Sequence, residues 1–305
     1  MENIKNKQLT FSVVIPTKNR TEDLLSAVKS VLSQSRLPDA LIIVDQSVSS
    51  VADSLILLLL DNHKGIDYKY IFNNTLTGLT AAKNSAVKVS CSDILLFIDD
   101  DIVLDPGFIE VLEKTYVRYP ELSGVGGVVS LPEHRQIFLR NIIAPIFQIG
   151  PFYDVRNLLQ YGYKANREVI PAAVLSGGLS SIKREVFEHE LFNEDLHGAS
   201  PIEDYDFFLR ASRRFKFALA TKATALHNVS PVSRLGLRRA FERKTSGFSY
   251  IYKRYVPKSL LNSFSFFWKN IGISVDALAI SAIHLTLEPI IGVLLAWKIV
   301  PAEKK

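Results

Sequence analysis

The chain has 305 residues, of which 48% are hydrophobic and 22% charged, so bulk disorder is excluded and one large domain or two small ones are expected. A single cysteine, Cys91, excludes a disulfide framework and a cysteine-based zinc site, and it favours a reducing compartment. Residues 1–9 form a polar tail without the apolar core of a signal peptide, so a cytoplasmic location is expected. The net charge of +5 is uneven, because residues 234–258 contain eight basic side chains and one acid, Glu242.

Apolar segments of strand length alternate with amphipathic segments of helical length through the first hundred residues. This alternation predicts a parallel sheet with helices on both faces. No GxGxxG sequence follows the first expected strand and no GxxxxGK[ST] sequence occurs, which argues against a dinucleotide-binding dehydrogenase and a P-loop enzyme. The expected strands are residues 11–15 (stopped by Pro16), 41–44 and 68–72, and the expected helices are about residues 21–35, 55–60 and 79–89.

Three consecutive aspartates, Asp99 to Asp101, follow a continuous apolar run at residues 94–98. Such a run is typical of a strand buried on both faces, and open α/β folds bind their ligands at the carboxyl ends of these strands. In an extended chain Asp99 and Asp101 share a face, where two carboxylates repel each other unless a cation joins them. Mg²⁺ or Mn²⁺, together with a substrate phosphate, is the expected occupant. The alternative is a helix-start cluster, but Asp105-Pro106 already predicts the next helix start, with Asp105 as the N-cap.

Six motifs occur in an order that characterises a known family. They are residues 13–20 (VVIPTKNR), 43–47 (IVDQS), 78–84 (GLTAAKN), 99–101 (DDD), 176–178 (SGG) with 183–184 (KR), and 203–204 (ED). On these motifs the chain resembles the family 2 glycosyltransferases over about residues 10–230. The resemblance implies the GT-A fold, a mixed, mainly parallel sheet flanked by helices. Gln46 stands where an acid is common and Lys83 where arginine is common, which leaves the base and sugar open.

The resemblance also implies a nucleoside diphosphate sugar as the donor. Asp45, at a strand end, would accept the ring N–H of a uracil-like base, and a turn aspartate is the alternative. Lys83 would offer a positive charge to the diphosphate. Asp99 would meet the ribose or a water bound to the metal, and Asp101 would meet the metal itself. His227 would contact the metal, and a purely structural histidine is the alternative. The implied donor residues are Pro16, Thr17, Arg20, Asp45, Lys83, Asp99 and Asp100, and the implied ligands of Mn²⁺ or Mg²⁺ are Asp101, Asp99 and His227.

A second group of motif residues is expected on the acceptor side. Gly177 and Gly178 would let the backbone approach a ligand closely, with an ordinary turn as the alternative. Glu203 and Asp204 open an expected helix, where acids often only complement the helix dipole. In the resembled family this pair supplies the general base, so Asp204 would take the proton of an acceptor hydroxyl. One base and one metal-bound leaving group imply a single in-line displacement with inversion.

Residues 231–305 are expected to form a basic and then strongly apolar helical region. Asp276, His284 and Glu288-Pro289 interrupt the apolar part, so no run reaches the 18 residues of a membrane span. Helices that lie in the membrane interface or pack as a bundle are favoured, and a re-entrant or single-span segment stays open. The basic patch beside them favours an anionic membrane surface over nucleic acid.

The prediction is therefore a glycosyltransferase on the cytoplasmic face of a membrane, with a glycan or a lipid-linked saccharide as its acceptor. Two other classes stay open. A nucleotidyltransferase also combines an α/β sheet with metal-binding acids, but it would release pyrophosphate. A non-catalytic membrane scaffold would not need its acids, and the intact set of acids argues against it.

Overall fold

The computed structural model describes residues 8–130, 144–160, 166–196, 202–230 and 236–298. Its first half is a parallel sheet in which β1 (Phe11–Thr17) lies between β2 (Ala40–Asp45) and β4 (Ile94–Ile98), with β3 (Asp67–Phe72) beyond β2. Every residue of β1, β2 and β4 is buried, as the continuous apolar runs predicted. The expected strand–helix alternation is confirmed.

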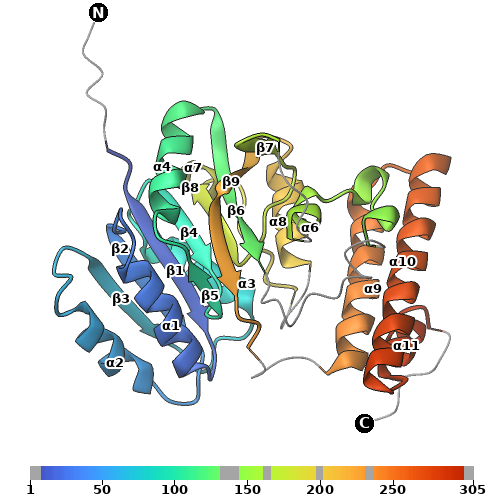
Figure 1. Cartoon of the computed structure of the whole chain (residues 1–305), viewed down its shortest axis with the longest axis horizontal. Helices are drawn as coiled ribbons and strands as arrows, with labels where there is room; N and C mark the ends of the chain where they lie inside the picture. The colour runs from blue at the N-terminus through green and yellow to red at the C-terminus, as the bar shows by residue number, and fades with distance from the viewer. Residues whose placement is uncertain (1–7, 131–143, 161–165, 197–201, 231–235, 299–305) are drawn as a thin grey trace, which may run out of the picture.

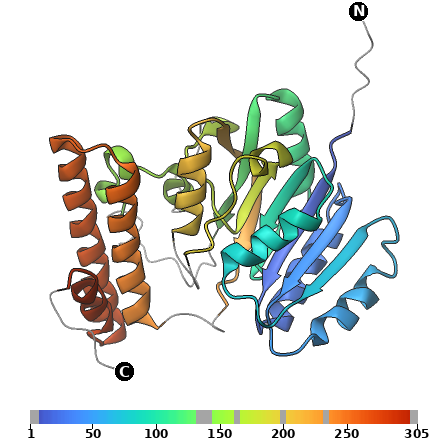
Figure 2. The same cartoon turned by 180° about the vertical axis from the view of Figure 1, so that it is seen from behind.

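Helices cover both faces of this sheet. One apolar cluster joins α1 (Thr21–Leu32), α2 (Val51–Leu60) and α4 (Phe108–Arg118) to one face. A second cluster joins α3 (Leu79–Val89), α7 (Arg184–Phe187) and α8 (Glu203–Ala211) to the other. Figure 1 looks onto the face covered by α1 and α2, and Figure 2 looks onto the face covered by α3 and α8.

The second half of the sheet is mixed. The strand order is β3-β2-β1-β4-β8-β6-β9-β5, and β7 (Val169–Pro171) also pairs with β9 (Lys216–His227). β8 (Leu179–Lys183) is antiparallel to both β4 and β6 (Leu122–Ser130), whereas β6 and β9 are parallel. In the part of the chain that the structure describes, nine strands flanked by helices therefore form the expected mixed α/β sheet.

Two local expectations were wrong. Pro16 does not stop β1, which continues to Thr17, because beyond Val14 the strand pairs only with β2 and the missing proline N–H is tolerated on the open side. Asp105 is not a helix N-cap: the chain first forms β5 (Ile102–Leu104), and α4 starts after Gly107, which has a φ of 87°. The Asp105 side chain accepts a hydrogen bond from the hydroxyl of Thr224 on β9 instead.

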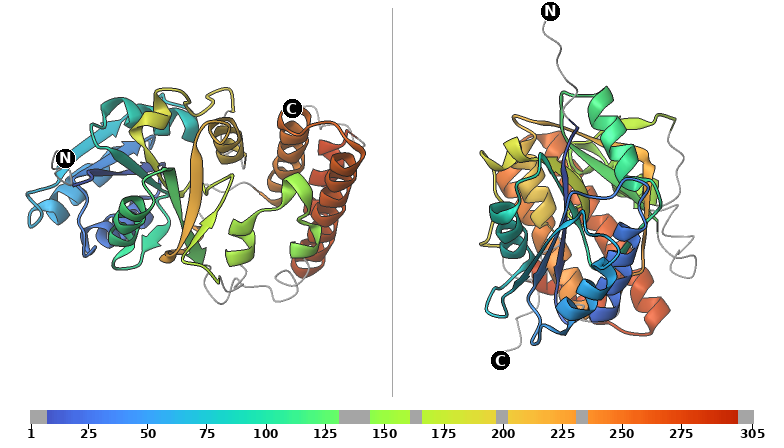
Figure 3. Two further views of the ribbon diagram at one scale, coloured as in Figure 1. Left: turned by 90° about the horizontal axis from the view of Figure 1, so that it is seen from above. Right: turned by 90° about the vertical axis from the view of Figure 1, so that its left-hand side faces the viewer.

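The last three helices form a bundle beside the sheet. They are α9 (Leu237–Tyr255), α10 (Leu260–His284) and α11 (Glu288–Ala296). The Ser259 hydroxyl caps α10 by accepting a hydrogen bond from the amide of Asn262 at 3.1 Å. α9 and α11 approach closely at Gly292, where a Cβ atom would overlap the carbonyl oxygen of Arg238. In Figure 3 the short helices η2 (Ala144–Phe147) and η3 (Gly150–Phe152) lie between this bundle and the sheet.

Among the described residues, α10 is the one helix long and apolar enough to cross a membrane, by length and composition alone. Its two charged residues, Lys269 and Asp276, do not take its hydropathy below that of a membrane span. This differs from the expectation that charged residues would exclude a span in this region. Lys269 is 8% exposed, and Asp276 pairs with Lys244 of α9 at 2.8 Å. α10 thus turns its charges toward the bundle.

Candidate functional site

The predicted site residues gather where β1, β2 and β4 end, at the lower edge of the sheet in Figure 1. Thr17 and Asp45 are register partners at the ends of β1 and β2. The three aspartates follow β4, and His227, at the end of β9, pairs with Ile102. The common edge expected from the sequence is therefore present.

Asp99 to Asp101 form a turn and not an extended segment, because the amide of Ile102 donates to the carbonyl of Asp99 at 3.1 Å. Asp100 points toward β1, where Thr17 Oγ1 donates to it at 2.8 Å and Arg20 Nη1 at 2.9 Å. Burial raises the pKa of Asp100 to about 6, although Arg20 and Thr17 act in the opposite direction. Thr17, Arg20 and Asp100 thus bind one another at the base of the site.

Asp101 and His227 form the part of the site that suits a metal. His227 Nε2 lies 3.1 Å from Asp101 Oδ1, and the amide of Ser230 donates to Asp101 Oδ2 at 2.9 Å. Neighbouring ligands of an octahedral ion with bonds of about 2.1 Å are roughly 3 Å apart, so this spacing fits. The described residues contain no cluster of three or more His, Cys, Asp or Glu side chains with metal-binding geometry. An ion here would complete its shell with water or substrate oxygens.

Asp99 lies on the other side of the turn, against β8. Its amide donates to the carbonyl of Gly178 at 3.0 Å, and a Cβ atom at residue 178 would overlap its carboxylate. Gly178 therefore makes room for Asp99. Burial raises the pKa of Asp99, and the positive charge of Lys83 opposes the shift.

Lys83 is fully buried at the centre of the site. Its ammonium lies 3.6 Å from Glu203 Oε1 and 5.0 Å from the centre of the Phe192 ring. No described residue accepts a hydrogen bond from it. A Cβ atom at Gly177 would lie 2.9 Å from this ammonium, so glycine keeps the space beside it open. A buried ammonium without acceptors suits an anionic ligand such as a phosphate.

Glu203 and Asp204 occupy the first turn of α8. Burial raises the pKa of Glu203 to about 7, with Lys83 opposing the shift and Asp204 adding to it. Asp204 Oδ2 accepts hydrogen bonds from Arg156 Nη1 at 2.8 Å and from the amide of Gly177 at 3.4 Å. The two acids therefore have different cations beside them.

Asp45 makes the hydrogen bonds of a turn aspartate, and its role in binding the donor base stays a prediction. The amide of Ser47 donates to Asp45 Oδ1 at 2.8 Å, and the hydroxyl of Tyr70 donates to Oδ2. The residue is 1% exposed. Pro16, beside it in β1, is buried. Asn84, next to Lys83, is structural, because its amide bonds the backbone of Phe192 in both directions.

The sequence profile of the family described as "Glycosyl transferase family 2" matches residues 12–191. The chain belongs to this family. The matched range includes the motifs at the ends of β1, β2 and β4. Glu203, Asp204 and His227 lie beyond it.

Similar proteins agree with this membership. The uncharacterized glycosyltransferase YwdF of Bacillus subtilis is 26% identical over 227 residues, which cover 73% of this chain and 75% of YwdF. The glucosyl-dolichyl phosphate glucuronosyltransferase of Haloferax volcanii is 31% identical over 124 residues, 40% of this chain and 38% of that protein. The mannosyltransferase PcManGT of Pyrobaculum calidifontis, solved with GDP-Man and Mn²⁺, superposes with a TM-score of 0.61 at 13% identity, covering 96% of this chain and 87% of PcManGT. The neighbour shows the same fold.

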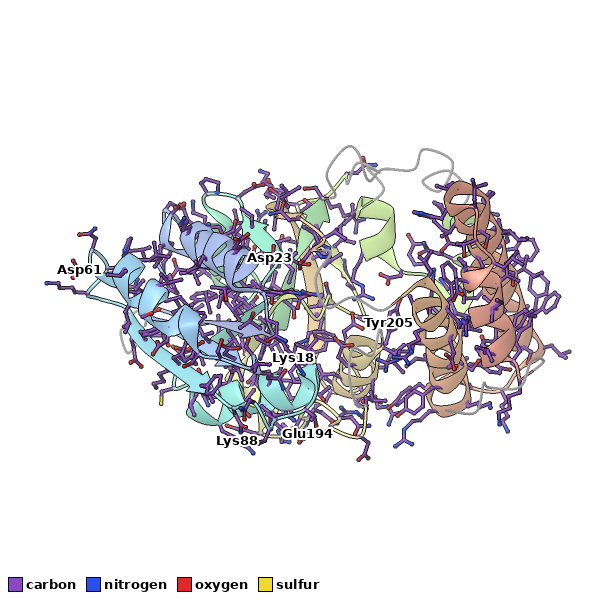
Figure 4. All side chains as sticks on the ribbon, turned by 90° about the horizontal axis from the view of Figure 1, so that it is seen from below. Lys18, Asp23, Asp61, Lys88, Glu194 and Tyr205 are labelled. Carbon is purple, nitrogen blue, oxygen red and sulfur yellow. The ribbon has the colours of Figure 1, made fainter. Side chains whose placement is uncertain are left out.

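In this family 2 glycosyltransferase, sequence reasoning missed the residues that surround Asp204. Arg156, in α6 (Val155–Gln160), and Asp154 before it come from a segment of weak periodicity. The one signal available was a charged Asp-Val-Arg sequence at residues 154–156 within an apolar, aromatic stretch. Tyr205, which contacts both, lies between the sheet and α9 (Figure 4).

Proposed function

We propose that this family 2 glycosyltransferase transfers a sugar from a nucleoside diphosphate sugar to a hydroxyl of a glycan or a lipid-linked saccharide, with inversion. The observation that carries the proposal is the buried Lys83 ammonium, which lies between the aspartates that follow β4 and the acids of α8 and has no hydrogen-bond acceptor among the described residues. A diphosphate would satisfy it. The GDP-Man complex of the neighbour PcManGT supports this class of donor.

Asp204 is proposed as the general base. It would take the proton of the acceptor hydroxyl as the acceptor oxygen bonds to the anomeric carbon and the bond to the diphosphate breaks on the opposite face. Lys83 would stabilise the negative charge that develops on the diphosphate. Asp101 and His227 would hold Mn²⁺ or Mg²⁺, with Asp99 assisting through a water bound to the ion, and the metal would supply further positive charge to the same leaving group. The Mn²⁺ in the PcManGT complex supports this assignment.

The C-terminal helices are proposed to hold the enzyme on an anionic membrane surface at the cytoplasmic face. α10 leaves many apolar side chains uncovered: Leu260, Leu261, Phe264, Phe267, Leu278 and Ile283 are each at least half exposed. Arg239, Lys253, Arg254 and Lys258 are exposed basic residues on α9 and next to it. Apolar and basic side chains together suit an anionic leaflet. A lipid-linked acceptor agrees with the name of the Haloferax relative, a glucosyl-dolichyl phosphate glucuronosyltransferase.

The test is a panel of UDP-, GDP- and dTDP-sugars incubated with the full chain and Mn²⁺ or Mg²⁺, with analysis of the released products. A nucleoside diphosphate is expected from one donor in the panel. In a parallel incubation of the chain with a nucleoside triphosphate and a sugar 1-phosphate, release of pyrophosphate would identify a nucleotidyltransferase instead. Absence of turnover and of metal-dependent binding across the panel would favour a non-catalytic scaffold.

A further inference from the structure

Arg156 joins two carboxylates that come from different parts of the chain. Its Nε and Nη2 donate to the two oxygens of Asp154 at 2.9 and 2.8 Å, which is a bidentate pair. Its Nη1 donates to Asp204 Oδ2 at 2.8 Å and also to the carbonyl of Leu175. All three nitrogens are therefore engaged, and the plane of the guanidinium is fixed by four separate acceptor atoms.

These contacts form a closed ring of four residues, Asp154, Arg156, Asp204 and Tyr205. The hydroxyl of Tyr205, the residue after Asp204, donates to Asp154 Oδ2, and the Arg156 guanidinium lies 4.8 Å from the centre of the Tyr205 ring. Burial alone would raise the pKa of Asp154, but the charge and hydrogen bonds of Arg156 outweigh it and the pKa is lowered. Asp154 is thus an ionised anchor for Arg156. The side chains of Arg156 and Asp154 are 14% and 6% exposed.

Glu203 and Asp204, the neighbouring acids of α8, differ in their contacts with this ring of residues. Glu203 faces Lys83 at 3.6 Å without a direct hydrogen bond, whereas Asp204 is bonded directly to Arg156. A general base must be ionised and within hydrogen-bond reach of the proton it takes. The Asp204 carboxylate is held at both oxygens, because the amide of Tyr205 also donates to its Oδ1 at 2.8 Å.

We propose that Arg156, anchored by Asp154 and Tyr205, is a positioning residue that fixes the orientation of the Asp204 carboxylate for proton transfer. The inference rests on the proposed role of Asp204 as the base. Because each of its three nitrogens already donates a hydrogen bond to a protein oxygen, Arg156 acts on the reaction through Asp204. A misplacement of the base by about 1 Å is sufficient for a loss of about 10²-fold in turnover.

The test compares Arg156→Ala with Arg156→Lys in the full chain, using the sugar nucleotide that the wild type turns over. For Arg156→Ala, kcat should fall about 10²-fold while the KM for the donor is unchanged. Arg156→Lys should recover part of the loss, since it restores the charge but not the planar fork. Guanidinium chloride, well below denaturing concentrations, should raise the kcat of Arg156→Ala. It should have no effect on the double variant with Asp204→Asn.

Arg214→Ala is the matched control, because it removes an exposed arginine that contacts His189 and lies outside this ring. Its turnover should equal that of the wild type and should not respond to guanidinium. Wild-type kcat in Arg156→Ala overturns the proposal. So does a loss that guanidinium leaves unchanged in a variant that still binds UDP or GDP with Mn²⁺ as the wild type does.

Failure of the proposed function gives a different result. A wild-type chain that turns over no sugar nucleotide refutes glycosyl transfer, and the positioning role falls with it. A double-mutant cycle in thermal stability between Arg156→Ala and Asp204→Asn then shows whether the ion pair itself exists. Non-additive Tm losses confirm the pair, and additive losses refute it.

Discussion

The hydroxyl of Tyr250 on α9 donates a hydrogen bond to Asp206 Oδ1 on α8 at 3.0 Å. Asp206 is fully buried and also accepts hydrogen bonds from the hydroxyl of Tyr255 and from Arg210 Nε at 3.1 Å. α8 begins with Glu203 and Asp204. The helix that carries the proposed base is therefore held on one side by α9 and at its first turn by Arg156.

Substituting Asp206 by alanine should destabilise the whole chain. The change leaves the donors of Tyr250, Tyr255 and Arg210 without their common acceptor, and breaking a buried pair of this kind costs about 3 kcal/mol. Urea unfolding measures the effect. Tyr252→Phe is the control, because among the described residues that hydroxyl bonds only the exposed Ser263, and its effect should stay within about 0.5 kcal/mol. An equally small effect of Asp206→Ala would show that α8 and α9 are not coupled through this residue.

Asp204→Asn should lower turnover by about 10²–10⁴-fold while donor binding survives, because the amide keeps the shape of the side chain but does not accept the proton. Steady-state kinetics and nucleotide titration measure the two quantities separately. Near-normal turnover in a folded Asp204→Asn variant would show that Asp204 is not the general base.

Asp101→Ala should abolish the metal-dependent part of donor affinity. Asp101 lies 3.1 Å from His227, and its other oxygen is fixed by the amide of Ser230, so the carboxylate is oriented for a cation. Calorimetric titration of UDP or GDP with and without Mn²⁺ gives the difference. Glu22→Ala, an exposed acid in α1, should leave it unchanged. Wild-type activity that persists in a chelator would contradict the metal assignment itself.

Membrane attachment should depend on both the basic and the apolar side chains. Arg239→Glu with Lys253→Glu should weaken binding to phosphatidylserine vesicles at low salt, because each exposed basic residue contributes on the order of 1 kcal/mol. Arg238 is unsuitable for this test, since it pairs with Glu288 of α11 at 2.8 Å. Phe264→Ser with Phe267→Ser should remove the part of the attachment that survives salt. If the full chain does not bind vesicles, the uncovered face of α10 is not a membrane-binding surface.

Stability should rise between pH 8 and 9.5 because of Lys269. Burial and the charge of Lys244 lower its pKa to about 8, although Asp154 and Asp276 oppose the shift. An unfolded lysine titrates near 10.4, so in this window the unfolded chain binds more protons and unfolding becomes less favourable as the pH rises. The gain should be about 2 kcal/mol in the unfolding free energy. Lys269→Met should abolish this pH dependence. If the unfolding free energy of that variant rises with pH as in the wild type, another group causes the dependence.

The sequence predicted the features of the fold that repeat locally. Strand–helix alternation placed β1 to β4 and α3 to within one or two residues, and the strand ends placed Asp99 to Asp101 at the ligand edge. It could not predict that Asp105 bonds Thr224, because that contact depends on a pairing between residues more than a hundred positions apart. Arg156 was missed for a similar reason, because its partner Asp204 lies 48 positions further along the chain. A salt bridge between distant segments leaves no periodic pattern in the chain.

Gly292 has a consequence for motion. The separation of α9 and α11 at this point is limited by backbone atoms, because a Cβ atom would overlap the carbonyl of Arg238. Side chains can change rotamer to absorb a small shift between helices, but a contact between backbones cannot relax in this way. A displacement of α11 toward α9 must therefore push α9 in the same direction. Through Tyr250 and Tyr255 that displacement reaches Asp206, two residues after Asp204.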